Sequence, residues 1–280
     1  MGNSLVLQSD FGTSDGAVSA MYGVANTIDP TLRIFDLTHH ISQFNIWEAS
    51  YRLVQTLPYW PEHTVFVSVV DPGVGTDRRS VVAKTKTNHY VVTPDNGTLT
   101  HLNQQYGIAE VREIDETINR FPKSENSYTF HGRDIYAYTG AKLASGVITF
   151  AQVGPSAEED IVLLPMFESR IEGNSVKGNI DILDVRFGNV WTNINRSLLH
   201  DLNIQTGDMV KVKVYGELGT ILNKRLIYAR TFGEVPVGEP VMYVNSIDKI
   251  GIAINQGSFA DLYNISMGNK WFIKITAYDR

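Results

Sequence analysis

An apolar run that ends abruptly in an acid and a glycine-rich turn is the feature that most constrains this fold. Residues 64–70 (TVFVSVV) have the length and composition of a buried strand, and Asp71 and the sequence PGVG follow at once. Open α/β sheets bind ligands beyond the carboxyl ends of their strands, so we expect Asp71 at such an edge. The turn can bring Arg78 and Arg79 back toward the carboxylate. The alternative is a surface turn with solvated charges.

A second strand of the same kind lies near the start of the chain. Residues 5–7 (LVL) read as a short buried strand, Asp10 follows it, and Asp15 precedes a predicted helix that runs to about residue 28. In a parallel sheet, Asp10 and Asp71 would reach the same edge, where two carboxylates can bind ribose hydroxyls, bind a metal or act as bases. The alternative for Asp10 is a hydrogen bond within its own turn.

Strands and helices alternate through residues 1–162, which predicts an N-terminal α/β domain. Further strands are expected at residues 32–37, 80–83 and 90–93, and further helices at residues 45–57, 97–106 and 130–144. His131 lies at the start of the last helix, where an imidazole can act as a base, hold a water or cap the helix. The adjacent His39 and His40 would point to opposite faces of a strand, so no metal site is expected there.

The pattern changes after residue 162. We expect a linker at residues 163–172 and a small all-β domain at residues 173–280, a barrel or a sandwich, because short apolar segments alternate there with Gly, Asn and Asp. The segment 184–193 mixes aromatic side chains with the amides of Asn189 and Asn193. Stacking faces beside amides suit a purine, and ordinary barrel core is the alternative.

Composition excludes several classes of protein. The 280 residues include 24 basic and 30 acidic side chains, a formal net charge of −6, and no basic run, so no nucleic-acid partner is expected. The absence of cysteine excludes disulfides and thiolate metal sites. No segment has the apolar length of a membrane helix or the pattern of a signal peptide, so a cytoplasmic protein without membrane contact is expected. Walker, HExxH and complete dinucleotide-binding motifs are missing.

Six segments occur in an order that resembles one enzyme family. They are SDFGTSD (9–15), VVDPGVGTDRR (69–79), TPDNGTL (93–99), FHGRD (130–134), FGNVWTNI (187–194) and the stretch 245–255. Together they resemble the S-adenosyl-L-methionine hydroxide adenosyltransferases, which are related to the fluorinase and chlorinase enzymes. The resemblance spans nearly the whole chain and is far more specific than any one segment.

The resemblance implies an architecture and a reaction. The expected fold is an N-terminal α/β domain with a central, mainly parallel seven-stranded sheet, followed by a C-terminal β-barrel. The expected assembly is a homotrimer, with each active site between the N-terminal domain of one subunit and the C-terminal domain of the next. The implied reaction converts S-adenosyl-L-methionine (SAM) and water into adenosine and L-methionine, with no metal and no cofactor besides the substrate.

The family's Asp-Arg-His triad corresponds to Asp71, Arg78 and His131, which would activate the water. Either Asp71 or His131 could accept the proton, and Arg79 is expected to be solvated or structural. The halogenating relatives carry tyrosine at the positions of Asp71 and His131 and serine at that of Gly132. Hydroxide, rather than a halide, is therefore the expected nucleophile.

The same matching predicts the residues that bind the substrate. Asp10 would bind the ribose hydroxyls; Phe44, Phe187, Trp191 and Phe232 would enclose the adenosine; Asn189 and the backbone around Ile254, Asn255 and Gln256 would meet the adenine edge; and Asp15, Asp184 and Ser246 would hold the methionine. Three positions depart from the pattern: Phe44 and Ile247 stand where the fluorinase has tryptophan and arginine, and Gly251 stands where many hydrolytic members carry an acid. The contact to the methionine carboxylate therefore stays open.

Three alternatives remain for a chain with this sequence. A SAM-dependent halogenase of the chlorinase kind would form chlorodeoxyadenosine instead of adenosine. A non-catalytic sensor would bind adenosine or SAM without releasing methionine. A purely structural protein would bind no nucleoside at all.

Overall fold

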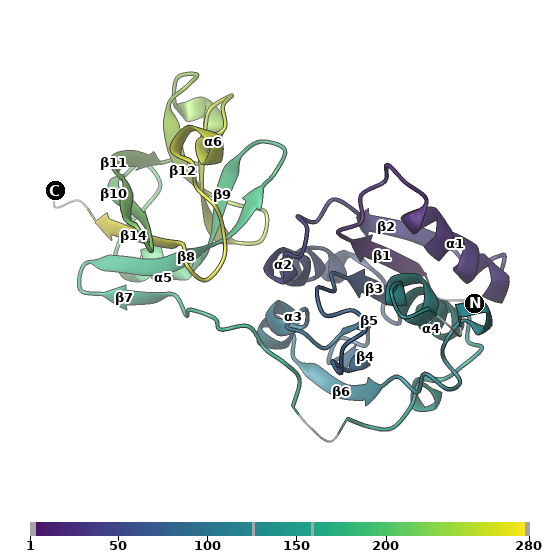
Figure 1. Ribbon diagram of the computed structural model, residues 1–280. Helices are drawn as coiled ribbons and strands as arrows, with labels where there is room; N and C mark the ends of the chain where they lie inside the picture. The colour runs from purple at the N-terminus through teal and green to yellow at the C-terminus, as the bar shows by residue number, and fades with distance from the viewer. Residues whose placement is uncertain (1–3, 125–126, 158–159, 278–280) are drawn as a thin grey trace. The chain divides into compact units, whose positions relative to one another are not determined.

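The computed structural model describes residues 4–124, 127–157 and 160–277. The chain divides into two compact units, Met1–Leu164 and Pro165–Arg280. The first is an α/β unit and the second is almost entirely β (Figure 1). No helix in the described ranges has the length and apolar character needed to cross a membrane.

A six-stranded mixed sheet forms the centre of the first unit, in the order β2-β1-β3-β5-β4-β6. Its strands are β1 (Leu5–Ser9), β2 (Ile34–Thr38), β3 (Val65–Val69), β4 (Ser80–Thr85), β5 (Tyr90–Pro94) and β6 (Ile108–Glu113). The pairings β1–β2, β1–β3 and β3–β5 are parallel, whereas β4 is antiparallel to both β5 and β6. Every residue of β1 and β3 is buried, as expected for the near-continuous apolar runs of central parallel strands.

The prediction of a seven-stranded sheet is wrong, since the described residues of this unit form six strands. Residues 153–157 run beside β6 and form two hydrogen bonds with it. The carbonyl of Pro155 accepts from the N–H of Glu113, and the N–H of Ala157 donates to the carbonyl of Val111. The pairing stops at an isolated bridge between Arg112 and Ser156. Pro155 has no N–H to donate, which limits this segment to an edge contact instead of a full strand.

Helices cover both faces of this sheet. Figure 1 shows α1 (Ala17–Ile28) and α4 (Tyr138–Ala144) on one face, and α2 (Ile46–Thr56) and α3 (Thr100–Gln105) on the other. A π-helical segment, Gly132–Ala137, leads directly into α4, so the helix predicted from residue 130 has an irregular first turn. The side chain of Asn45 accepts a hydrogen bond from the N–H of Glu48 and caps α2, which fixes the loop before it.

A closed seven-stranded barrel forms the second unit, so the prediction of a C-terminal β-barrel is confirmed. Its strands are β8 (Ser175–Asp184), β9 (Asn189–Asn195), β10 (Met209–Gly216), β11 (Gly219–Tyr228), β12 (Pro240–Val244), β13 (Lys249–Ile254) and β14 (Phe272–Ala277), with β7 (Arg170–Glu172) added at the edge of β8. The pairing of β14 with β8 closes the ring. Two short helices, α5 (Arg196–Asp201) and α6 (Phe259–Tyr263), follow β9 and β13.

Candidate active site

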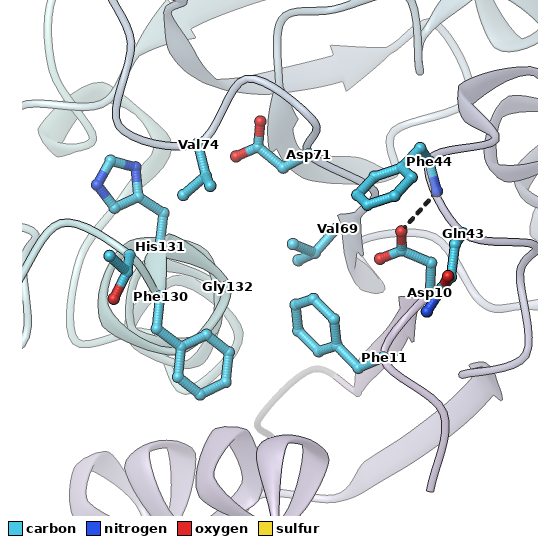
Figure 2. A pocket seen from close by; sticks show the side chains of 11 residues that line it. Asp10, Phe11, Gln43, Phe44, Val69, Asp71, Val74, Phe130, His131 and Gly132 are labelled. Atoms are coloured by element: carbon cyan, nitrogen blue, oxygen red, sulfur yellow. Dashed lines mark hydrogen bonds between the residues drawn. The ribbon is translucent and has the colours of Figure 1, made fainter.

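A cavity of about 300 Å³ opens where β1 and β3 end (Figure 2). Its lining residues are Asp10, Phe11, Gln43, Phe44, Val69, Asp71, Val74, Thr129, Phe130, His131 and Gly132. The two strands are parallel neighbours, and Ser9 is opposite Val69 in the ladder. The residues that follow them therefore emerge at one edge of the sheet, which brings Asp10 and Asp71 to the same cavity.

Arg78 and Asp71 form a bidentate ion pair. The guanidinium Nε donates to Oδ1 of Asp71 at 2.9 Å, and Nη2 donates to Oδ2 at 2.5 Å. Both side chains are largely buried, with 11% and 6% of their surfaces exposed. Burial lowers the pKa of Arg78, but the hydrogen bond to Asp71 and nearby negative charge outweigh it, so the net pKa is raised. The pair is therefore a fixed arrangement of opposite charges beside the cavity.

His131 lies between two guanidinium groups. Nη2 of Arg78 is 2.9 Å from its Nδ1, and Nη2 of Arg120 is 3.4 Å from its Nε2. Guanidinium groups only donate, and a neutral imidazole has a single lone pair, so His131 can accept at one ring nitrogen, and the shorter contact makes that nitrogen Nδ1. Burial, followed by the positive charge of Arg78, lowers the pKa of His131 below its ordinary value, although Glu116 and Asp71 act in the opposite direction. The ring is therefore held in its neutral form near pH 7.

The Arg78 guanidinium also contacts two residues that do not line the cavity and that the sequence did not indicate. Nη1 of Arg78 donates to Oγ of Ser80 at 3.0 Å, and the guanidinium lies 5.6 Å from the ring centre of Tyr136. The hydroxyls of Ser80 and Tyr136 are 3.2 Å apart. Tyr136 is fully buried, and its pKa is raised mainly by burial, so its hydroxyl stays protonated. Neither residue stands in a recognisable motif, and their contribution follows only from packing.

The neighbouring Arg79 has a different role. Its side chain pairs with Asp95, at 2.5 Å between Nη2 and Oδ2, and it also donates to the carbonyl of Asp160. Asp95 in turn accepts from the N–H of Val162. The structural alternative stated for Arg79 is confirmed, because this arginine ties the end of β5 to the last residues of the first unit.

Asp10 does not bond within its own turn. Its Oδ2 accepts a hydrogen bond of 2.9 Å from the N–H of Phe44, the dashed line in Figure 2. Phe44 has a φ of 64°, a left-handed backbone that side chains rarely adopt, and its side chain is 66% exposed. The carboxylate thus holds a strained loop that presents Phe44 and Gln43 at the cavity. Figure 2 shows these residues on one side of the cavity and His131 on the other.

A Ser-His-Asp arrangement lies beside the Asp10 turn, but its serine and histidine are buried. Oγ of Ser9 is 2.6 Å from Nδ1 of His39, whose Nε2 is 2.9 Å from Oδ1 of Asp36. Ser9 is fully buried and His39 is 2% exposed, so no substrate can reach the hydroxyl. The N–H of Gly12 also donates to the carbonyl of His39. These contacts fix the turn that carries Asp10.

Two predicted residues of the first unit are not among those that line the cavity: Arg78, which bonds to Asp71 and His131 there, and Asp15. Oδ1 of Asp15 accepts from the N–H of Ala17 at 2.9 Å, so this side chain bonds the first turn of α1 as expected for a residue before a helix. Among the described residues, no cluster of three or more His, Asp or Glu side chains could hold a metal ion.

The remaining predicted residues lie in the barrel unit, in three groups. Asp184, Phe187, Asn189 and Trp191 lie on β8, on β9 and in the turn between them, where Nδ2 of Asn189 donates to Oδ2 of Asp184. Phe232 and Ser246 are exposed, before and after β12. Ile254, Asn255 and Gln256 end β13 and begin the turn beyond it.

The turn after β13 limits which backbone groups are free for an adenine edge. The N–H of Asn255 donates to the carbonyl of Glu239, and its carbonyl accepts from the N–H of Gly238. The carbonyl of Ile254 accepts from the N–H of Gly257. Gln256 has a φ of 57°, is exposed and lies beyond the last residue of β13. Of these three residues, Gln256 is the best placed to meet a ligand.

Sequence reasoning missed several residues at the cavity and behind it. Phe11 and Phe130 meet edge to face with 5.6 Å between ring centres and line the wall beside Gly132. Both lie inside the motifs SDFGTSD and FHGRD, which was the available signal. Gln43 and Arg120 lie in no motif, and only the tertiary structure places them.

Comparisons with known proteins agree with this architecture. A family model described as the SAM hydroxide adenosyltransferase N-terminal domain matches residues 5–154, and one described as the C-terminal domain of the same family matches residues 178–272. An (R)-S-adenosyl-L-methionine hydrolase of Salinispora tropica is 34% identical over 96% of this chain and 96% of its own length.

The chain is also similar to a fluorinase and to a protein of known crystal structure. A fluorinase of an Actinoplanes species is 28% identical over 95% of this chain and 96% of its own length. The crystal structure of an uncharacterized conserved protein from Thermotoga maritima has a TM-score of 0.88 and 36% identity, and covers 97% of this chain and 99% of that one. Since both family domains match in order and the hydrolase aligns over nearly the full length, the chain belongs to the SAM hydroxide adenosyltransferase family.

Proposed function

We propose that the protein hydrolyses SAM to adenosine and L-methionine by attack of water on the ribose C5′. The observation that carries the proposal is the placement of Asp71 and His131 on one cavity, with Arg78 bonded to both. Membership in the family and the hydrolase relatives support it. The fluorinase relatives are less similar to this chain, and a halogenase is the second candidate.

The enzyme needs to do little to help the leaving group depart. SAM is a sulfonium, so as the new C5′–O bond forms and the C5′–S bond breaks, the electron pair goes to sulfur and methionine leaves as a neutral thioether. The enzyme must hold a water in line with C5′ and remove one of its protons. Positioning of the reactants can supply several kcal/mol of such a barrier, at most about 7–11 kcal/mol. The charge of Arg78 would stabilise the developing hydroxide.

Asp71 is the better proton acceptor in this arrangement. A protonated His131 would place a third cation between Arg78 and Arg120, and it would have no lone pair left for either guanidinium. A carboxylate has about four lone-pair positions, and Arg78 uses one on each oxygen of Asp71, so each oxygen can still accept. In this proposal His131 stays neutral and orients Arg78 and the water.

Substrate recognition is proposed to follow the family pattern. Asp10 would bind the ribose hydroxyls, and the exposed aromatic side chains Phe44, Phe187 and Phe232 would enclose the adenosine together with Trp191. These residues belong to both units, which fits the proposed homotrimer with sites between subunits. Asp184 and Ser246 would hold the methionine, with Asp15 at the start of α1 as a further candidate. We propose a cytoplasmic enzyme that needs no cofactor besides its substrate.

A product analysis in labelled water tests the function. The purified protein is incubated with SAM and chloride in H₂¹⁸O, and the products are separated by chromatography. The expected products are adenosine and methionine in equal amounts, with ¹⁸O in the adenosine 5′-hydroxyl. Chlorodeoxyadenosine would identify a halogenase, and binding of SAM with no methionine release would identify a sensor.

A further inference from the structure

Three residues on adjacent strands of the barrel lie directly opposite one another. Tyr243 on β12 is paired with Gly251 on β13, and Gly251 is paired with Trp191 on β9. Residues opposite each other in antiparallel strands project to the same face of the sheet. Two strand spacings of about 4.8 Å separate Tyr243 from Trp191. A side chain on Gly251 would stand between them.

The missing side chain of Gly251 allows the two aromatic residues to meet. Nε1 of Trp191 donates a hydrogen bond of 2.8 Å to the hydroxyl oxygen of Tyr243, across the intervening strand. A Cβ at position 251 would lie 2.8 Å from Cζ, 2.9 Å from Cε1 and 3.0 Å from the hydroxyl oxygen of Tyr243. The Tyr243 ring therefore lies directly over the glycine, and even an alanine would displace it.

This aromatic cluster is on the outer face of the barrel. Met242, Ile250 and Ile252 face the barrel core, whereas Tyr243 packs in a separate cluster with Ala229, Val241 and Ala253, to which Trp191 is adjacent. Phe232 packs edge-on against Tyr243, with 4.7 Å between ring centres, and is 40% exposed. Tyr243 itself is only 7% exposed. Tyr243 is thus a buried residue that contacts two more accessible aromatic side chains, Trp191 and Phe232.

We propose that Tyr243 is a positioning residue, which fixes Trp191 through its hydroxyl and Phe232 through its ring, and that Gly251 must lack a side chain for this arrangement to form. The proposal rests on the proposed function, in which Trp191 and Phe232 enclose the adenosine. Tyr243 lies under them and acts on binding through their orientation. Burial raises the pKa of Tyr243 to about 12, so its hydroxyl is neutral and remains a stable acceptor for the indole N–H throughout the working range of pH.

Tyr243→Phe is the direct test, because it keeps the ring that Phe232 packs against and removes the oxygen that accepts from Trp191. The chain has four tryptophans, and Trp191→Phe identifies the indole N–H signal of Trp191 by NMR. In Tyr243→Phe this signal is expected to shift and to exchange faster with solvent. The dissociation constant of adenosine is expected to rise about three- to tenfold, as for one lost neutral hydrogen bond. KM for SAM should rise in parallel, with kcat changed less than twofold, and methionine affinity should not change.

Two further variants complete the design. Tyr228→Phe removes another hydroxyl from a buried tyrosine of the same barrel and should leave adenosine affinity unchanged. Gly251→Ala should also weaken adenosine binding, as Tyr243→Phe does, because the added methyl group would displace the Tyr243 ring. If Gly251→Ala fails to fold, Tyr243→Phe still decides, since it adds no atom to the barrel.

The outcomes separate this proposal from the proposed function. An unshifted indole signal in Tyr243→Phe, or a shifted signal with unchanged adenosine affinity, overturns the positioning role while the wild-type enzyme still releases methionine. A wild-type protein that neither binds adenosine nor hydrolyses SAM overturns the proposed function and this proposal together. A loss of kcat with unchanged KM would also contradict it, because the residue would then act on the reaction and not on binding.

Discussion

Arg78 reaches His131 with a hydrogen bond of 2.9 Å from its Nη2 to the imidazole Nδ1. The same Nη2 donates to Asp71, so one guanidinium nitrogen joins the carboxylate to the imidazole. Since arginine never accepts, this contact requires a lone pair on Nδ1 and fixes the protonation state of the ring. His131 is consequently a neutral member of a charged cluster, which separates it from the general-base histidines of many hydrolases.

The titration of His131 is the first prediction. Burial and then Arg78 lower its pKa, with Arg120 acting in the same direction and Glu116 and Asp71 opposing. Arg120→Gln removes a cation beside Nε2 and frees Glu116, so the pKa of His131 should rise relative to wild type. The measurement is an NMR titration of the imidazole signals, assigned with His131→Gln. An unchanged pKa in Arg120→Gln would show that this arginine does not influence the ring.

Stability should depend on the same proton. The pKa of His131 in the folded protein lies below the unfolded value of about 6.5. As the pH falls below about 6.5, the unfolded chain takes up a proton before the folded one does, so the free energy of unfolding falls. His131 contributes its full stability above about pH 6.5 and loses it as the pH falls through the folded pKa. Urea denaturation between pH 7.5 and pH 5 should therefore show a smaller pH slope in His131→Gln than in wild type.

The adjacent arginines provide a matched pair of variants. Arg78→Lys keeps the charge but loses the bidentate contact with Asp71 and the bond to His131, so turnover should fall about 100-fold. Arg79→Lys disrupts the pair with Asp95, outside the cavity, and should lower the free energy of unfolding by about 1–2 kcal/mol with near-normal turnover. Steady-state kinetics and urea denaturation on both variants provide the comparison. Equal losses of turnover would refute the separation of roles.

The sequence predicted the positions that depend on strand ends. Asp10 and Asp71 follow apolar runs, and parallel pairing of β1 and β3 brings such residues to one edge whatever the details of packing. The change from alternating strands and helices to closely spaced strands likewise predicted an all-β second unit, because hydrophobic periodicity is a local property of the chain, whereas the choice of a barrel over a sandwich came from the family resemblance.

Other features depend on contacts between distant segments and could not be predicted from local patterns. Ser80 and Tyr136 support Arg78 from two different elements, and the left-handed backbone of Phe44 is held by a carboxylate 34 residues away. The error in strand number has the same origin. Whether residues 153–157 complete a strand depends on how Pro155 meets β6, and the resemblance to a family does not encode that contact.

Asp10 is predicted to recognise the ribose hydroxyls, and a substrate lacking one of them tests this. Wild type should discriminate against the 2′-deoxyribose analogue of SAM by roughly 10- to 100-fold in kcat/KM, the range for a hydrogen bond to a charged group. Asp10→Asn should reduce this preference, because the amide can still accept from the N–H of Phe44 but lacks the charge. Comparison of the four kcat/KM values measures the coupling. An undiminished preference in Asp10→Asn would place the ribose contact elsewhere.

Gly132→Ser should strain the wall of the cavity beside His131. A Cβ at position 132 would lie 3.0 Å from Cε2 and Cζ of the Phe11 ring and 3.2 Å from Cγ1 of Val69, so the ring has to move. Overpacking of this kind costs about 1–3 kcal/mol. Gly23→Ala on α1, where an added Cβ meets nothing within 4 Å, is the control and should gain up to about 1 kcal/mol. Urea denaturation of both variants gives the comparison, and Phe11→Leu in the Gly132→Ser background should recover part of the loss. If Gly132→Ser is as stable as wild type while Gly23→Ala behaves as expected, the Phe11 ring yields freely, and the glycine is required by the reaction and not by the packing.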